Sequence, residues 1–197
     1  MFWAVGALAV QVLVTRAGSG RDFSRPAGSP RRGLLYNFTV ALLPGHKETA
    51  RLHPLEFVLG ILLHVGSLSS ILGGILLVVW PVAGYGALTL ARPLAVVTLL
   101  AGLWLLVRRI AWKTLRAISV PDDYLALLAT IGLLAWTGAA PIGPRNEVGF
   151  LLYFGLVLLY FPLGKLRHAV FFFVARADYG RRLGYRGVYP PARAGKE

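Results

Sequence analysis

The sequence contains no cysteine and only eight acidic residues among its 197 positions. The absence of cysteine excludes a chain-ligated iron–sulfur cluster, a thiolate zinc site, a disulfide framework and a cysteine nucleophile. It also excludes a covalently attached c-type haem, which needs a Cys-x-x-Cys-His motif. Strong nitrogen ligands for a metal can come only from the four histidines, which are His46, His53, His64 and His168.

Charge is scarce, because charged residues make up 15% of the chain and hydrophobic residues 56%. Long windows carry no formal charge at all, which is typical of helices whose solvent is lipid. The net charge of +13 would suggest nucleic acid in a soluble protein. Here the Arg and Lys residues cluster beside apolar runs, where the positive-inside rule explains them, so we expect no nucleic-acid partner.

The apolar runs predict an all-α integral membrane bundle of about five transmembrane helices in a single domain, 1–197. The first run ends at Arg16 and is short, covering only ~21 Å of a ~30 Å hydrocarbon core. A signal peptide is the alternative for this run, but no positive side chain precedes it and several follow it. The fifth span is interrupted at Phe161 to Lys165. The expected spans are about 2–15, 55–80, 87–107, 124–140 and 148–174.

Basic residues fall on one side of these spans. The 16–53 loop, the loop after Arg108 and Arg109, and the 175–197 tail are rich in Arg and Lys, whereas the other two loops carry only Arg145 and Glu147. The positive-inside rule therefore predicts an amino terminus outside and a carboxyl terminus in the cytoplasm.

Two histidines lie inside expected spans. His64 is about nine residues (~13 Å of helix rise) from the cytoplasmic end of its span, and His168 is about six residues (~9 Å) from the cytoplasmic end of another. Two imidazoles at matched depth on different helices can supply both axial ligands of a non-covalent, b-type haem. The alternative is that each histidine only hydrogen-bonds a neighbouring carbonyl or lines a water pocket.

The other two histidines lie in or beside the first cytoplasmic loop. If the second span begins early, His53 and Glu56 share a helix face, three residues apart, and could handle protons near the membrane surface. His46 needs no special role.

Three segments resemble the respiratory nitrate reductase gamma subunit family of haem b membrane subunits, which includes sulfite-reduction-associated and heterodisulfide-reductase-like menaquinol oxidoreductases. They are Leu63-His64-Val65-Gly66, Arg108-Arg109 with Leu115 to Tyr124, and Phe161-Pro162-Leu163-Gly164-Lys165-Leu166-Arg167-His168. The resemblance covers roughly residues 45 to 175, and the last segment is the most specific. It implies five helices with the amino terminus outside.

The nitrate reductase branch of that family carries two haems, each held by one histidine of the second helix and one of the last. The resemblance places Gly74 and Phe150 where the ligands of the outer haem would fall, so it implies a single haem on the cytoplasmic side. A quinone could then approach His64 and His168 directly, or occupy the volume around Gly73 and Gly74.

The leading hypothesis is thus an electron-transfer subunit of the inner (cytoplasmic) membrane. Its haem b would connect quinone or quinol to a cytoplasmic iron–sulfur subunit of a respiratory oxidoreductase, and the chain would have no substrate-transforming site of its own. The alternative is a non-redox membrane anchor, scaffold or transporter subunit, in which the two histidines are polar contacts between helices.

Overall fold

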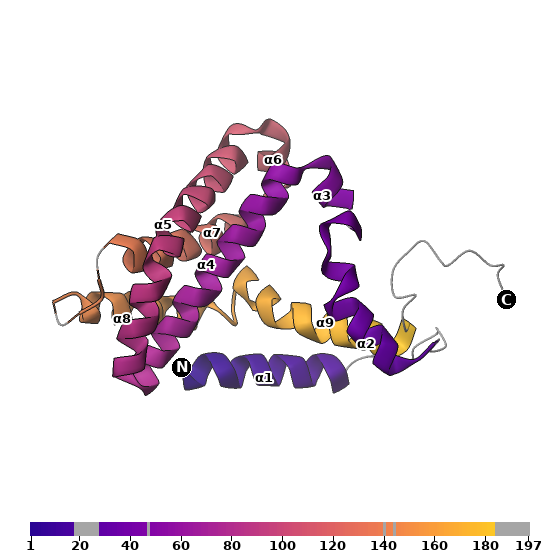
Figure 1. The fold of residues 1–197 in the computed structure, drawn as a ribbon, viewed down its shortest axis with the longest axis horizontal. Helices are drawn as coiled ribbons and strands as arrows, with labels where there is room; N and C mark the ends of the chain where they lie inside the picture. Colours follow the sequence, from indigo (N-terminus) through magenta and orange to yellow (C-terminus); the bar gives the residue numbers. More distant parts are fainter. Residues whose placement is uncertain (18–27, 47, 140, 144, 184–197) are drawn as a thin grey trace. The chain divides into compact units, whose positions relative to one another are not determined.

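The computed structural model describes residues 1–17, 28–46, 48–139, 141–143 and 145–183 (Figure 1). Regular structure in these residues is entirely helical, which confirms the all-α class. The elements are α1 (Phe2–Ala17), α2 (Pro30–Phe38), η1 (Val40–Leu42), η2 (Pro44–His46), α3 (Glu48–Leu52), α4 (Pro54–Val79), α5 (Pro81–Ala111), α6 (Lys113–Ile118), α7 (Pro121–Ala139), α8 (Glu147–Tyr160), η3 (Lys165–Arg167) and α9 (His168–Leu183).

Two of these helices, α4 and α5, are long and apolar enough to cross a membrane. A third crossing is added if α8 and the segment from Lys165 to Arg182 form one broken span. The break falls at the expected interruption, where Gly164 N–H donates to the Tyr160 carbonyl. Five spans and the orientation of the termini remain predictions.

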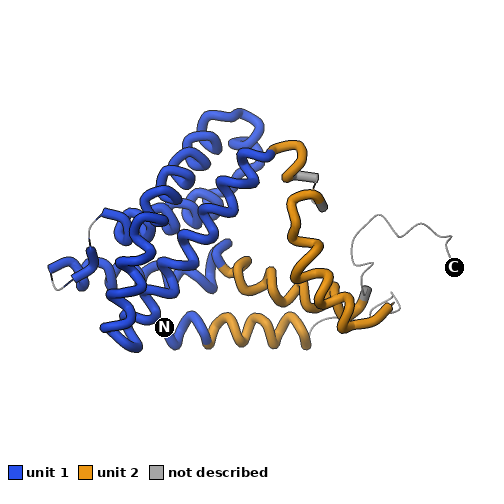
Figure 2. The backbone as a smooth tube through the Cα atoms, viewed as in Figure 1, with its two compact units in different colours: residues 1–5, 54–166 blue, residues 6–53, 167–197 orange. Residues whose placement is uncertain are grey.

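The chain divides into two compact units (Figure 2). Unit 1 holds residues 1–5 and 54–166, and unit 2 holds residues 6–53 and 167–197. The sequence predicts one membrane domain, and the structure divides into these two units.

An α4–α5 hairpin is the centre of unit 1. Pro81 is the first residue of α5. An amide N–H at this position has no partner within the helix, so the lack of an N–H in proline costs no helical hydrogen bond. The two helices approach closely at glycines: a Cβ on Gly84 would lie 2.2 Å from the backbone N and Cα of Leu77, and one on Gly66 would lie 2.1 Å from Thr98 Oγ1. Close backbone approach at small residues is how helices associate without a hydrophobic driving force between them.

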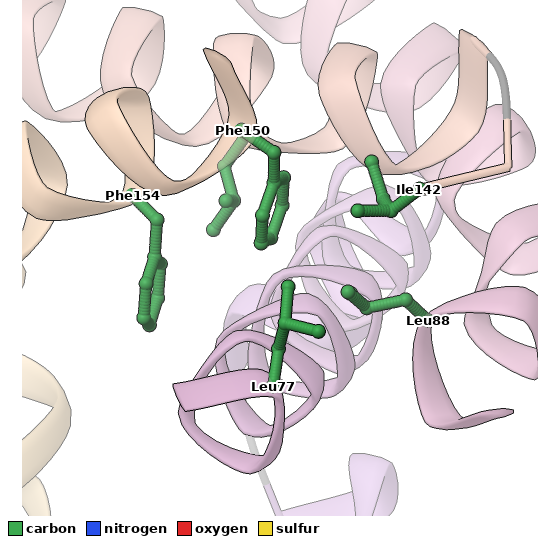
Figure 3. Packing of buried hydrophobic residues seen from close by; sticks show 6 residues of the cluster. Leu77, Leu88, Ile142, Phe150 and Phe154 are labelled. Carbon is green, nitrogen blue, oxygen red and sulfur yellow. The ribbon is translucent and has the colours of Figure 1, made fainter. Parts of the chain in front are cut away.

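The core of unit 1 lies where α8 and the 141–143 segment meet the hairpin (Figure 3). Phe150 and Phe154 are 0% and 2% exposed, and their rings stack with centroids 5.9 Å apart. The cluster consists of Leu77, Leu88, Leu133, Ile142, Phe150 and Phe154.

Unit 2 is built on the packing of α2 against α9. Asn37 is 2% exposed, and its amide donates to the Gly33 carbonyl, 2.9 Å away. Arg176 Nη1 donates to the Asn37 carbonyl over 3.1 Å, and the rings of Phe38 and Phe173 stack. The segment expected as a basic loop, 16–53, thus contains one helix of this packed pair.

Candidate functional site

His64 lies on the exposed surface of α4, near the middle of a membrane-length helix. Its Nδ1 is 2.6 Å from the Gly60 carbonyl, one turn back along the helix. A carbonyl only accepts, so this hydrogen bond requires a hydrogen on Nδ1, and in the neutral imidazole Nε2 is then the nitrogen that can coordinate a metal. This tautomer, fixed by a backbone carbonyl, is the one that metal-binding histidines commonly adopt.

His168 is the first residue of α9, directly after the break that ends α8, and its side chain is also exposed. Phe172 and Tyr179 lie one and three turns further along the same face, 39% and 55% exposed. His64 belongs to unit 1 and His168 to unit 2.

The other two histidines, His46 and His53, lie outside α4 and α9. His46 ends η2, and its side chain lies outside the described part of the chain. His53 precedes α4 and is not helical, so it does not share a helix face with Glu56. Glu56 instead forms an ion pair with Arg108 over 3.2 Å. The proposed His53–Glu56 proton-handling pair is therefore not formed on α4.

The volume beside Gly73 and Gly74 is filled by side chains. A Cβ on Gly73 would lie 2.7 Å from Leu88 Cδ2, and one on Gly74 would lie 2.9 Å from the Phe154 ring. Leucine and aromatic side chains thus pack directly against these two glycines, and a quinone site in their neighbourhood stays a prediction.

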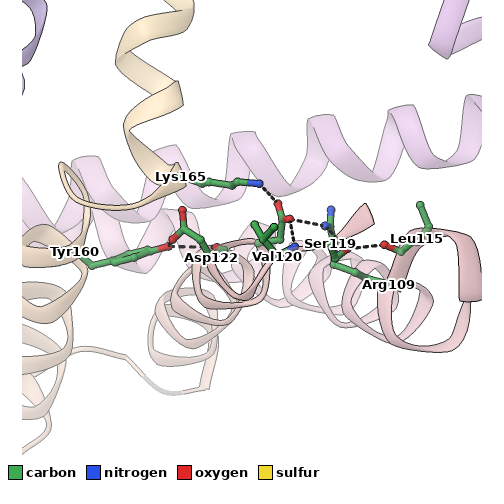
Figure 4. Close-up of polar contacts among 8 residues, drawn as sticks. Arg109, Leu115, Ser119, Val120, Asp122, Tyr160 and Lys165 are labelled. Carbon is green, nitrogen blue, oxygen red and sulfur yellow. Dashed lines mark hydrogen bonds and ion pairs between the residues drawn. The ribbon is translucent and has the colours of Figure 1, made fainter. Parts of the chain in front are cut away.

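A polar cluster gathers at the end of unit 1 where α5 finishes and α7 begins (Figure 4). Asp123 accepts a hydrogen bond from Lys165 Nζ over 2.6 Å and lies 3.5 Å from Arg109 Nη1. It also accepts from the Val120 backbone N–H over 2.9 Å, as a residue of the first turn does when it caps the helix start. The hydrogen bond from Lys165, the bond from Val120 and the charge of Arg109 together lower the pKa of Asp123, against a smaller opposing effect of burial.

Neighbouring groups extend this cluster to α8. The Tyr160 hydroxyl donates to the Asp122 carboxylate, and Arg109 Nη1 donates to Ser119 Oγ over 2.9 Å. Two segments that resemble the haem b family, 115–124 and 161–168, both supply residues to this cluster. Within unit 1, their contacts join the start of α7 to the end of α5 and to the residues that follow α8. Opposite charges on the two segments were the signal that could have predicted this contact.

The other end of the hairpin carries a second set of polar contacts. Arg92 donates to the carbonyls of Gly138 and Ala139, over 3.2 and 3.4 Å, at the carboxyl end of α7. The Tyr85 hydroxyl donates to Glu147 Oε2 over 2.6 Å. Arg92 thus places a positive charge at the negative end of the α7 dipole, which is favourable. The sequence alone did not predict a partner for Arg92.

Among the residues that the structure describes, no three side chains of His, Asp or Glu come together in a way that could hold a metal ion. The comparisons with known proteins gave no match: no family model, no curated protein and no solved structure resembles this chain at a significant level.

Proposed function

We propose that this chain is a multi-pass cytochrome b subunit of the inner (cytoplasmic) membrane, with one haem b held by His64 and His168. It passes electrons between quinone and a cytoplasmic iron–sulfur partner of a respiratory oxidoreductase. His64 and His168 would hold the haem, which would supply one-electron redox chemistry.

The observation that carries this proposal is the fixed tautomer of His64. An exposed imidazole on a membrane-length helix is costly unless a ligand or polar group meets it. Donation from Nδ1 to the Gly60 carbonyl orients the ring, and Nε2 is the nitrogen that would coordinate the haem iron. His168 contributes an exposed imidazole. Its distance from the expected cytoplasmic end of its span is similar to that of His64.

Cations near the cytoplasmic boundary would bind the haem propionates. Arg108 is already paired with Glu56, and both Arg109 and Lys165 are paired with Asp123. Arg51 and Arg167 are exposed and form none of these pairs, so they are the better candidates for charge-assisted hydrogen bonds to propionates.

The aromatic core of unit 1 supports a single haem rather than two. Gly74 and Phe150 stand where the resemblance would place the outer ligands, and Phe150 and Phe154 fill that region with a stacked, buried pair. No second macrocycle fits there without displacing the core.

The second candidate is a non-redox membrane anchor, scaffold or transporter subunit. It is favoured by the same bond from His64 to Gly60, because a purely structural histidine also satisfies its N–H on its own helix.

A reduced-minus-oxidised absorption spectrum of the purified protein separates the two candidates. Cytochrome b bands are expected in the wild type and in His46→Ala and His53→Ala, and loss of the six-coordinate spectrum in His64→Ala and in His168→Ala. Helical circular dichroism of each variant verifies folding. A folded wild-type protein without haem bands after expression with excess haem supports the non-redox candidate, and retention of the spectrum in folded His64→Ala refutes the ligand assignment.

A further inference from the structure

The α5–α6 corner, residues 108–120, joins the end of a long helix to a short one through a single residue, Trp112. The extended backbone of Trp112, at φ −78° and ψ 117°, breaks the helix there. Backbone hydrogen bonds still continue through the corner. The Trp112 N–H donates to the Arg108 carbonyl over 3.0 Å, and the Arg116 N–H donates to the Trp112 carbonyl over 2.9 Å. The direction of α6 is therefore tied to the end of α5.

Side chains hold this corner at both ends of α6. Before α6, the Arg108 guanidinium lies over the Trp112 ring, 5.7 Å from its centroid. After α6, the Ser119 hydroxyl donates to the Leu115 carbonyl over 2.6 Å and accepts from Arg109 Nη1 over 2.9 Å (Figure 4). Both ends of α6 are thus attached to α5 or to the residues beside it.

Charged and apolar side chains lie on different sides of α6. At about 100° per residue, Lys113 and Arg116 share one side of the helix, and Leu115 and Ile118 share the opposite side. Lys113 and Arg116 are exposed, and α6 buries none of its residues. This separation is typical of a helix that lies in the membrane interface.

The apolar side chains of the corner are largely uncovered. Trp112 is 50% exposed, Ile118 is 73% exposed and Val120 is 48% exposed. The corner directly follows α5, which is long and apolar enough to cross a membrane. The apolar medium at this position is therefore the edge of a bilayer, where tryptophan rings are enriched.

Positive charge exceeds negative charge at this end of unit 1. Glu56 is paired with Arg108, and Asp123 is paired with Arg109 and Lys165. Arg116 donates from Nη1 to the Ile110 carbonyl over 3.2 Å, and its other N–H groups can serve a ligand. Residues 54–58, 106–125 and 160–166 hold three carboxylates, Glu56, Asp122 and Asp123, against five cations, Arg108, Arg109, Lys113, Arg116 and Lys165.

We propose that the α5–α6 corner binds anionic phospholipid, with Lys113 and Arg116 contacting the headgroup phosphate and Trp112 and Ile118 contacting the upper part of the acyl chains. Cations on stems of this length reach the headgroups while the apolar groups enter the bilayer. An acidic protein or peptide would meet the two cations but would leave the apolar side of α6 uncovered. The assignment does not depend on haem binding.

The first test uses the full chain in detergent, titrated separately with dioleoyl phosphatidylglycerol and dioleoyl phosphatidylcholine, with bound lipids counted by native mass spectrometry. The corner variant carries Lys113→Gln and Arg116→Gln. The control variant removes the same charge from two exposed positions outside the corner, through Arg31→Gln and Arg145→Gln. Circular dichroism verifies that both variants fold.

The wild type is expected to prefer phosphatidylglycerol. The corner variant is expected to lose about tenfold or more in affinity for this lipid, because each Lys or Arg near an anionic surface contributes about fivefold. The control variant is expected to lose clearly less. The proposal is overturned by a wild type without preference, by an unchanged preference in the folded corner variant, by an equal loss in the control, or by binding of polyglutamate through Lys113 and Arg116 without a preference for phosphatidylglycerol.

The second test needs no change to the two cations. The chain has no cysteine, so Ile118→Cys and, in a separate protein, Arg145→Cys can each be labelled at one site with bimane. In nanodiscs that contain phosphatidylglycerol, both membrane faces are open to iodide, a water-soluble quencher. Bimane at position 118 is expected to be quenched several-fold less than bimane at position 145, and equal quenching would show that the apolar side of α6 stays in water.

Discussion

Replacing Gly84 by alanine is expected to destabilise the α4–α5 hairpin. The new Cβ would lie 2.2 Å from two backbone atoms of Leu77, whereas carbon atoms in contact prefer roughly 3.5–4.0 Å. The helices would have to separate by more than about 1 Å at this point. Because a backbone cannot rotate out of the way as a side chain can, we expect the upper part of the range for overpacking, about 3 kcal/mol.

Gly86 supplies the matched control, two positions further along α5. A Cβ on Gly86 meets nothing within 4 Å, so Gly86→Ala should stabilise the helix slightly, by about 0.5–1 kcal/mol, through reduced backbone entropy in the unfolded chain. The same chemical change is thus expected to have opposite signs at the two positions.

Thermal unfolding of the detergent-solubilised protein, followed by far-ultraviolet circular dichroism, measures both effects. For a chain of this size, about 3 kcal/mol corresponds to a fall in Tm of roughly 6–12 °C for Gly84→Ala. A Gly84→Ala protein that unfolds at the same temperature as Gly86→Ala, or higher, would refute the close approach of the two helices.

Three further predictions follow from the site. The pKa of Asp123 is lowered by its hydrogen bond from Lys165 and its other partners. The stability that this carboxylate contributes is therefore fully present above its unfolded pKa of about 3.9. It is lost as the pH falls through the lower pKa of the folded protein. Asp123→Asn should remove about 0.2–1 kcal/mol near neutral pH and abolish this acid-dependent part; equal Tm values for the two proteins from pH 6 to pH 2 would contradict this. A pyridine haemochrome assay should give one haem per chain, and a ratio near two would show a second site. A reporter fused after Glu197 should be active only in the cytoplasm, and periplasmic activity would overturn the span assignment.

The sequence predicts helix positions well because hydrophobic runs and prolines are local signals. The run expected at 55–80 corresponds to α4 at Pro54–Val79, and the one expected at 124–140 corresponds to α7 at Pro121–Ala139. Prolines open both helices and also α5, where they fix the starting φ angle. The interruption at Phe161 was visible because Pro162 and Gly164 both disfavour a continuous helix.

Contacts between helices could not be predicted in the same way. Glu56 pairs with Arg108, and Arg176 donates to the Asn37 carbonyl, because segments far apart in sequence pack together. Composition and periodicity carry no information on which helices meet. The sequence allows His64 to hydrogen-bond a neighbouring carbonyl, but which carbonyl and which ring nitrogen take part follows only from the structure. The haem and its quinone partner stay predictions.

The contact of Arg92 with the carboxyl end of α7 allows α7 to be much shorter than α5, the helix beside it. α7 has 19 residues and α5 has 31, or ~28 Å against ~46 Å. In an apolar medium the last carbonyls of the shorter helix would lack partners and would cost several kcal/mol each. Arg92 brings guanidinium donors from the neighbouring helix to two of these carbonyls. A short helix can therefore end beside a longer one, with hydrogen bonds from the longer helix to two of its last carbonyls.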